Sequence, residues 1–169
     1  ASNRADSVLS DFDRFLTNLP GGFQLFHLLH SNPDLLNLLV RILATAPKLT
    51  ELILRRPHVF DGMLEPQFFT GLASRDDLRT QLSVTLHQAR SYEDALDRAR
   101  ILAAEQKFLI GARVLAKALK PADAARYYSA LADELVNAML DIVLTEIERA
   151  HGKVPGAGCC IVGMGNLGS

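Results

Sequence analysis

The chain has 169 residues, of which 49% are hydrophobic and 22% are charged, and its 18 basic and 19 acidic side chains leave a net charge of −1. This balance is ordinary for a soluble globular domain, and it excludes a strongly basic surface that would recruit nucleic acid. No apolar run approaches the roughly 20 residues of a membrane span. We therefore expect one sizeable core and neither nucleic acid nor a membrane among the partners.

The first half of the chain predicts a series of short helices. Apolar residues at helical spacing mark a helix over 8–19 and a second one over 23–30. Three further helices are expected to begin at Pro33, Pro47 and Pro57, because proline is favoured at the first helical position, with Asn32 as the first N-cap. The apolar residues expected on these helices include Leu35, Leu38, Leu39, Ile42, Leu43, Leu49, Leu52, Ile53, Val59, Phe60 and Leu64.

The second half predicts longer helices. After a connector over 65–74, helices are expected over 76–90, from a Ser91 cap to Leu119, and over 121–150. The last two are amphipathic and joined by a short turn, which is typical of an antiparallel hairpin in a bundle. The predicted fold class is therefore all-α, a cluster of short helices followed by a long antiparallel hairpin, with a C-terminal orphan strand or tail. The apolar stripe of the last helix is Tyr128, Leu131, Leu135, Met139, Ile142 and Val143.

The C-terminal segment carries the most specific motif. An apolar run over 159–162 leads into Gly163, Gly165 and Gly168, which satisfy G-x-G-x-x-G. One interpretation is the dinucleotide fingerprint of a Rossmann fold, which needs a βαβ unit and an acidic residue about 20 positions later. Another is the opening of a nucleotidyltransferase fold, in which Gly168 and Ser169 end the turn before a helix that faces the nucleotide phosphates. A third is a frayed tail.

A strand without a neighbour leaves its backbone groups unpaired, so this chain is expected to be a piece of a longer protein. The adjacent Cys159 and Cys160 match no zinc spacing and rarely bridge each other. They indicate a reducing, cytoplasmic compartment.

Other candidate residues have plainer interpretations. His27 and His30 lie three apart on one helix, but no convergent ligand set accompanies them, so packing at a helix junction is favoured over a metal site. The arginines at 55, 56, 98 and 100 are candidates for phosphate or partner contacts, with a solvated helix face as the favoured alternative. Glu105, Lys107 and Arg113 are candidates for a polar contact to another helix or domain, with surface pairing as the favoured alternative.

The order of several short motifs resembles one family. The matching pieces are Phe15-Leu16 to Leu19-Pro20, Gln24-Leu25-Phe26, Ser31-Asn32-Pro33, Ala46-Pro47-Lys48-Leu49, Arg55-Arg56-Pro57, Phe60-Asp61 to Leu64, Glu105-Gln106, Ile110-Gly111, Leu131-Ala132-Asp133, His151-Gly152 and Val162-Gly163-Met164-Gly165 with Leu167-Gly168-Ser169. Together they cover nearly the whole chain. They resemble the bifunctional glutamine synthetase adenylyltransferase/adenylyl-removing enzymes of bacteria.

This resemblance implies a parent with two nucleotidyltransferase domains, one that removes AMP from glutamine synthetase and one that adds it. Residues 1–152 would be a helical regulatory or linker domain, and 153–169 the linker, first strand and Gly-Ser turn of the truncated second domain. The parent would use ATP and magnesium, act on a glutamine synthetase tyrosine, and respond to glutamine and the PII signal protein. This piece lacks the metal-binding aspartates, so it is expected to be non-catalytic and to hold no cofactor, with the catalytic domains of its own chain as partners.

The sequence departs from the family pattern at Asn166, where relatives often carry lysine, and at Ala103, Ala104 and Leu109, where they are often basic. Two alternatives stay open: a helical domain that precedes a Rossmann NAD(P)-dependent oxidoreductase, and a helical protein-interaction adaptor. An apolar face is expected to remain where a missing catalytic domain would pack, and to drive weak self-association.

Overall fold

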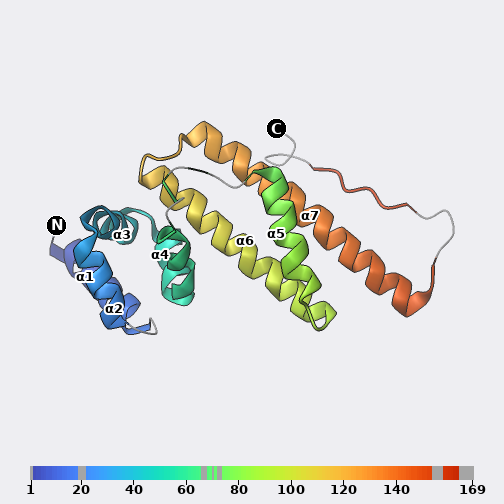
Figure 1. Ribbon diagram of the computed structural model, residues 1–169, viewed down its shortest axis with the longest axis horizontal. Helices are drawn as coiled ribbons and strands as arrows, with labels where there is room; N and C mark the ends of the chain where they lie inside the picture. Colours follow the sequence, from blue (N-terminus) through green and yellow to red (C-terminus); the bar gives the residue numbers. More distant parts are fainter. Residues whose placement is uncertain are drawn as a thin grey trace. The chain divides into compact units, whose positions relative to one another are not determined.

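The computed structural model describes residues 2–18, 22–65, 68–69, 71, 74–153 and 158–163, and the side chains of all of these except 2–4 and 22–26 (Figure 1). All regular secondary structure in these residues is helical, which confirms the predicted all-α class. No helix among them is both long and apolar enough to cross a membrane. The chain forms two compact units instead of the single core that its length suggests: Ala1–Leu72 with Ala104–Ala124, and Ala73–Ala103 with Ala125–Ser169.

The first unit contains the predicted cluster of short helices. They are α1 (Ser2–Asn18), α2 (Gly22–Ser31), α3 (Pro33–Thr45), α4 (Pro47–Arg55) and the 3₁₀ helix η1 (Pro57–Met63), joined by the C-terminal part of α6 (Tyr92–Leu115). Three of them begin at the prolines that the sequence indicated.

Single residues turn the chain between α2, α3, α4 and η1. The corners are Asn32, Ala46 and Arg56, with φ between −126° and −138° and ψ between 74° and 80°. Each precedes a proline, whose ring disfavours helical angles in the residue before it. The N–H of Ala46 donates to the Ile42 carbonyl, and the Ala46 carbonyl accepts from Thr50, so one residue ends a helix and begins the next. No long loop is needed at any of the three corners.

Asn32 differs from the expected N-cap. Its side chain makes no cap hydrogen bond to α3; Nδ2 instead donates to the Leu28 carbonyl at 2.8 Å. The preceding helix ends there with unpaired carbonyls, and an amide N–H₂ group satisfies one of them. The residue thus stands at the predicted position but closes α2 instead of capping α3.

The core of the first unit is aromatic and aliphatic. Phe15 of α1 meets Phe60 of η1 edge to face, with ring centroids 5.3 Å apart, and both side chains are fully buried. Phe108 of α6 is buried in the same cluster. The other buried members are Leu29, Leu35, Leu38, Leu39, Leu43, Ile42, Ile53, Val59, Met63, Phe68 and Ala112.

One apolar residue expected on the helix that begins at Pro57 lies just beyond it. Leu64 follows the last residue of η1 and is 39% exposed, and Met63 is buried instead. The segment is a 3₁₀ helix with three residues per turn, so the side chain below Phe60 is the one three positions later.

The end of α6 is earlier than predicted. The helix stops at Leu115 because Lys117 takes a left-handed conformation with φ of 60°. The N–H of Ala118 donates to the Arg113 carbonyl, and that of Lys117 donates to Val114, which is the Schellman pattern. Arg41 of α3 adds a hydrogen bond from Nη1 to the Leu115 carbonyl at 2.9 Å.

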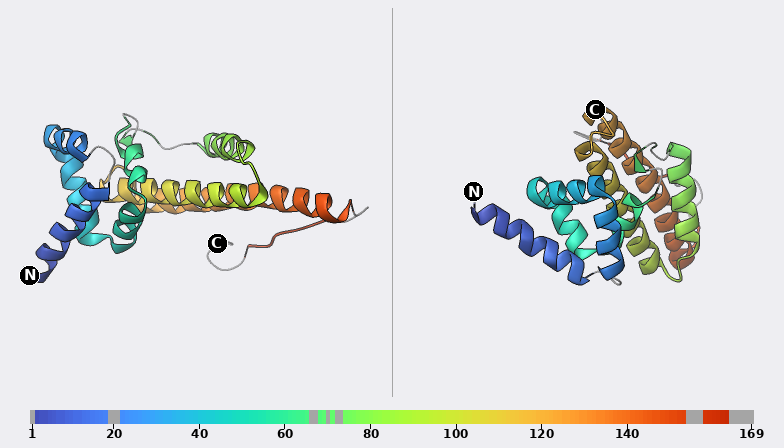
Figure 2. Two further views of the ribbon diagram at one scale, coloured as in Figure 1. Left: turned by 90° about the horizontal axis from the view of Figure 1, so that it is seen from below. Right: turned by 60° about the vertical axis from the view of Figure 1, so that its left-hand side comes forward.

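The second unit contains α5 (Arg75–His87), the first part of α6, and most of α7 (Pro121–His151). Within this unit the three segments lie side by side, and the α6 and α7 segments run antiparallel (Figures 1 and 2). Ser74 forms a capping box with Asp77: its hydroxyl accepts from the Asp77 N–H, and the Asp77 carboxylate accepts from the Ser74 N–H. The buried apolar residues are Leu78, Leu82, Ala95, Ala99, Leu102 and Leu131.

The C-terminal segment was expected to be an orphan strand or a tail. Residues 158–163 have no regular secondary structure, as in the tail alternative, and Cys159 and Cys160 are exposed. A strand needs a neighbour for its N–H and C=O groups, and the described part of the chain contains no strand to pair with it. The α7 helix ends at His151, one residue beyond the predicted range, and Gly152 follows with φ of 81°. The domain boundary at 152 stays a prediction.

Replacing Lys117 by glycine is expected to stabilise the protein. Glycine adopts positive φ without the clash that a Cβ causes, so Lys117→Gly should raise the free energy of unfolding by about 1 kcal/mol. Urea unfolding followed by circular dichroism measures the change in midpoint. The matched control is Ala118→Gly, which is exposed and has no positive φ. An equal gain in both variants would contradict the strain argument.

Candidate functional sites

The predicted nucleotide-binding turn falls at the edge of what the structure describes. Gly165, Gly168 and Ser169 lie outside the described residues, while Gly163 is exposed and in no helix. A nucleotide role for Gly168 and Ser169 therefore stays a prediction.

The histidine pair does not gather ligands. His27 and His30 are exposed on α2. Across the described part of the chain, no three His, Cys, Asp or Glu side chains lie close enough together to hold a metal ion. His30 instead lines an apolar cavity of about 370 Å³ with Phe12, Leu29 and Leu36.

Three of the four candidate arginines pair within their own helix. Each meets a carboxylate three or four residues earlier, and such surface pairs contribute well below 1 kcal/mol. Arg56 is half-buried, and its Nη1 atom has no hydrogen-bond partner in the described structure. The pairs are Arg55–Glu51 at 2.7 Å, Arg98–Asp94 at 3.0 Å and Arg100–Asp97 at 3.1 Å.

Glu105 and Arg113 on α6 each reach another element of the first unit. Glu105 accepts from His58 Nε2 at 3.2 Å. Arg113 donates from Nε to the Phe68 carbonyl at 2.8 Å, and its guanidinium lies 4.8 Å from the centre of the Phe68 ring. Lys107 is exposed. The polar contacts of Glu105 and Arg113 thus connect α6 to His58 and Phe68.

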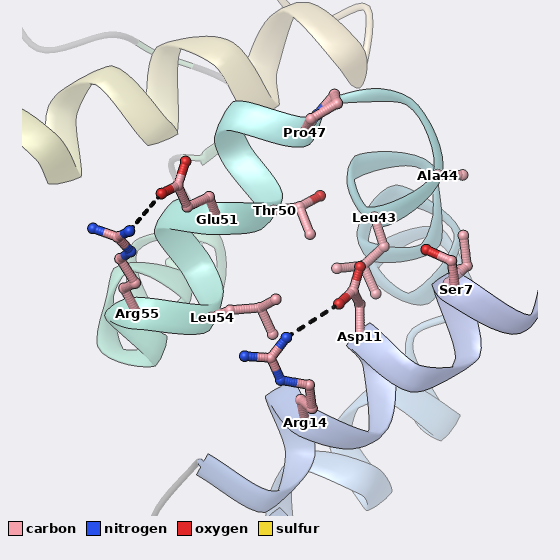
Figure 3. A pocket seen from close by; sticks show the side chains of 11 residues that line it. Ser7, Asp11, Arg14, Leu43, Ala44, Pro47, Thr50, Glu51, Leu54 and Arg55 are labelled. Atoms are coloured by element: carbon pink, nitrogen blue, oxygen red, sulfur yellow. Dashed lines mark ion pairs between the residues drawn. The ribbon is translucent and has the colours of Figure 1, made fainter. Parts of the chain in front are cut away.

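A cavity of about 510 Å³ lies among α1, α3 and α4 in the first unit (Figure 3). Its charged side chains are Asp11 with Arg14, 3.8 Å apart, and Glu51 with Arg55. Each cation is matched by a carboxylate on its own helix, so the cavity presents no net charge to attract a phosphate. The lining contains no histidine or cysteine, and its two carboxylates, Asp11 and Glu51, are both ion-paired.

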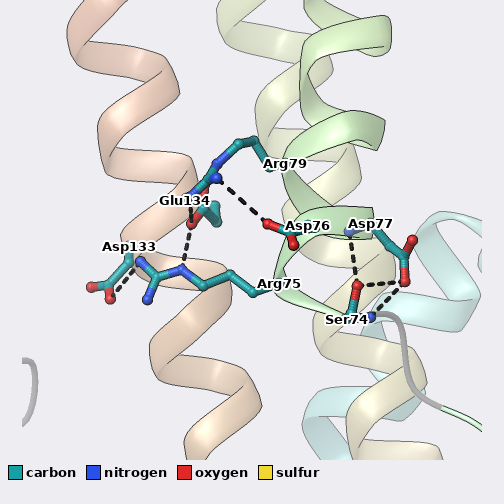
Figure 4. Close-up of polar contacts among 7 residues, drawn as sticks. All are labelled: Ser74, Arg75, Asp76, Asp77, Arg79, Asp133 and Glu134. Carbon is teal, nitrogen blue, oxygen red and sulfur yellow. Dashed lines mark hydrogen bonds and ion pairs between the residues drawn. The ribbon is translucent and has the colours of Figure 1, made fainter.

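The strongest polar cluster joins α5 to α7 in the second unit (Figure 4). Glu134 is only 3% exposed, yet it carries a carboxylate on the inner side of α7. Arg75 donates from Nε to Oε1 at 2.5 Å, and Arg79 donates to both oxygens at 3.0 Å. Arg75 also reaches Asp133 at 3.3 Å. The buried charge is therefore fully paired, as a buried carboxylate must be.

The two guanidinium groups lower the pKa of Glu134. The hydrogen bond from Arg79 is the largest cause and that from Arg75 the next, and they outweigh the desolvation that opposes them. Sequence reasoning missed this site. The signals in the sequence were Glu134, a charged residue next to Leu135 of the predicted apolar stripe, and Arg75 and Arg79, which are four residues apart on another helix.

A further cavity, in the second unit, lies on the side of α7 opposite Glu134 and is lined only by apolar residues. Its volume is about 390 Å³. Five of the lining residues belong to α7 and one to the C-terminal segment: Leu135, Val136, Met139, Leu140, Val143 and Ile161.

Neutralising the buried carboxylate is expected to destabilise the second unit. Glu134→Gln should lower the free energy of unfolding by about 2 kcal/mol, because one of the two acceptor oxygens becomes a donor N–H₂ group and the hydrogen bonds from Arg75 and Arg79 lose their negatively charged acceptor. Water can reach the half-exposed arginines, which keeps the loss below that of a fully buried pair. Chemical denaturation measures it. The matched control is Asp133→Asn, next in the chain but 54% exposed, which should change stability far less.

The effect of Glu134→Gln on the free energy of unfolding is also expected to depend on pH. The pKa of Glu134 is depressed in the folded state, so its stabilisation is present above the ordinary glutamate value of 4.5 and is lost as pH falls through the folded value. The stability difference between the unsubstituted protein and Glu134→Gln should thus be largest at neutral pH and shrink below about pH 4.5. A constant difference from pH 7 to pH 3 would contradict the assignment.

Comparison with known proteins identifies relatives along nearly the whole chain. It is 52% identical over 168 residues to the bifunctional glutamine synthetase adenylyltransferase/adenylyl-removing enzyme of Agrobacterium fabrum, 50% identical to that of Rhizobium meliloti and 34% identical to that of a Bradyrhizobium species. Each match covers 99% of this chain and 17% of the relative, so the chain spans about a sixth of the length of these enzymes.

No solved structure matches the chain. The family model described as glutamate-ammonia ligase adenylyltransferase matches residues 36–169, most of the sequence. With relatives that match the chain from end to end, this match is decisive: the chain belongs to the glutamate-ammonia ligase adenylyltransferase family.

Proposed function

We propose that this chain is a non-catalytic helical region of an enzyme that adenylylates and deadenylylates glutamine synthetase. The observation that carries the proposal is the 52% identity over 168 residues to a bifunctional enzyme of which the match covers 17%. A segment of that size, built of helices in all its described regular structure, is suited to linking and regulating catalytic domains. Membership of the family decides against the Rossmann oxidoreductase alternative and favours a linking role over a free-standing adaptor.

In the parent enzyme, a tyrosine hydroxyl of glutamine synthetase would attack the α-phosphorus of ATP, and pyrophosphate would leave. Magnesium held by aspartates of the catalytic domain would neutralise the phosphate charge. Gly168 and Ser169 would face those phosphates at the start of a helix. The residues described here would supply none of the reacting groups.

The contribution of the helical region would be rigidity. Single-residue corners connect α2, α3, α4 and η1, and the Glu134 cluster holds α5 on α7. Elements fixed in this way can hold catalytic domains in position and carry a regulatory signal between them. Glutamine and the PII protein are the proposed effectors, and the cytoplasm is the proposed location.

The isolated 169-residue chain is expected to transfer no AMP. Full-length enzyme, ATP, magnesium and glutamine synthetase should give adenylylated product, measured as incorporated radiolabelled AMP. The isolated chain under the same conditions should give none. Removing 1–152 from the full-length enzyme should lower transfer by about 100-fold, because the catalytic groups lose their positioning. Transfer by the isolated chain would contradict the non-catalytic assignment.

Ser169 is expected to matter for AMP transfer in the full-length enzyme. Ser169→Ala should lower transfer at least about tenfold, because a hydrogen bond to a phosphate oxygen is lost. Asn166→Ala, three residues earlier in the sequence, is the matched control and should keep most of the activity. Equal activities of the two variants would remove Ser169 from the nucleotide site.

A further inference from the structure

The outer side of α7 is an apolar face, and no helix among the described residues of the second unit lies over it. Its residues recur at the spacing of one helix side, whereas Leu131 and Glu134 lie on the inner side and are 1% and 3% exposed. On the outer side, Val136 is 37% exposed and Ile147 46% exposed. The outer face comprises Leu135, Val136, Met139, Leu140, Val143 and Ile147.

The C-terminal segment already lies against this outer face. Ile161 lines the 390 Å³ apolar cavity together with five α7 residues, although it remains 53% exposed. Val162 is 74% exposed. Within residues 158–163, Ile161 therefore lies at the outer face of α7.

The sequence of this segment indicates what covers the outer face. Cys159, Cys160, Ile161 and Val162 are consecutive apolar residues, a pattern typical of a strand that is buried on both sides of a sheet. In the structure described here all four are exposed. A helix on one side and a sheet neighbour on each edge would bury them, and the outer face of α7 offers an apolar helix surface at Ile161.

We propose that the outer face of α7 is the docking surface for a nucleotidyltransferase domain of the same polypeptide, whose sheet contains the strand Cys159–Val162. The inference rests on the proposed function, which makes residues 158–163 the entry to that domain. The match covers only 17% of the length of each relative, so the relatives contain enough chain outside the matched region for such a domain. The α7 helix would then pack against α5 on its inner side and against the catalytic domain on its outer side.

Cysteine labelling of the full-length enzyme tests this docking. Val136→Cys and Asn137→Cys are neighbours on α7, both exposed in the structure described here, but only Val136 belongs to the outer face. Each variant is treated with a maleimide, and mass spectrometry follows the peptide that carries the new thiol. If the catalytic domain covers the outer face, Val136→Cys should react at least about tenfold more slowly than Asn137→Cys, because labelling requires local opening.

Three outcomes would overturn the docking surface. They are equal labelling rates, slower labelling at Asn137→Cys, and protection of Val136→Cys that disappears on dilution, which would identify a second copy as the occupant. AMP transfer by the unsubstituted enzyme is measured in parallel. Loss of the proposed function would appear as absent transfer whatever the labelling rates, whereas failure of the docking alone would appear as equal labelling in an active enzyme.

Discussion

Every helix leaves backbone N–H groups at its start and carbonyls at its end that must find partners, and a chain divided into many short helices has many such ends. The first unit meets this constraint largely with its backbone and a few side chains. Ala46 and Arg56 each complete one helix and begin the next. Arg41 supplies a donor to the end of α6, and Asn32 supplies one to the end of α2. The buried aromatic core is assembled around ends that are already satisfied.

The second unit relies on a different interaction. Two of its helices, α6 and α7, are longer, so fewer ends need partners, and a buried carboxylate specifies how α5 meets α7. Glu134 can be satisfied only where Arg75 and Arg79 present their nitrogens together. A slip of α5 by one turn would leave the carboxylate buried with one partner or none, which costs far more than misplaced leucines would. The cluster therefore contributes to the choice of register as well as to stability.

The sequence predicted what is decided locally. The predicted helix starts at 33, 47, 57 and 121 all appear in the structure, because the backbone restriction that proline imposes lies within one or two residues. It did not predict what depends on distant partners or on helix type. Met63 replaces Leu64 because the helix is 3₁₀, and Glu134 is buried because two arginines about 55 residues away reach it. The candidate turn at Gly168 and Ser169 was read from a motif, and its geometry lies beyond the described residues.

The single-residue corners also restrict how this part of the chain can change in length. A residue inserted within an α-helix rotates everything after it by about 100° around the axis. With no loop residues between α2, α3, α4 and η1 to absorb such a rotation, an insertion or deletion would turn the apolar side of the next helix away from Phe15 and Phe60. Substitutions can accumulate between residues 33 and 63, but homologous chains must keep the same number of residues between Pro33, Pro47 and Pro57.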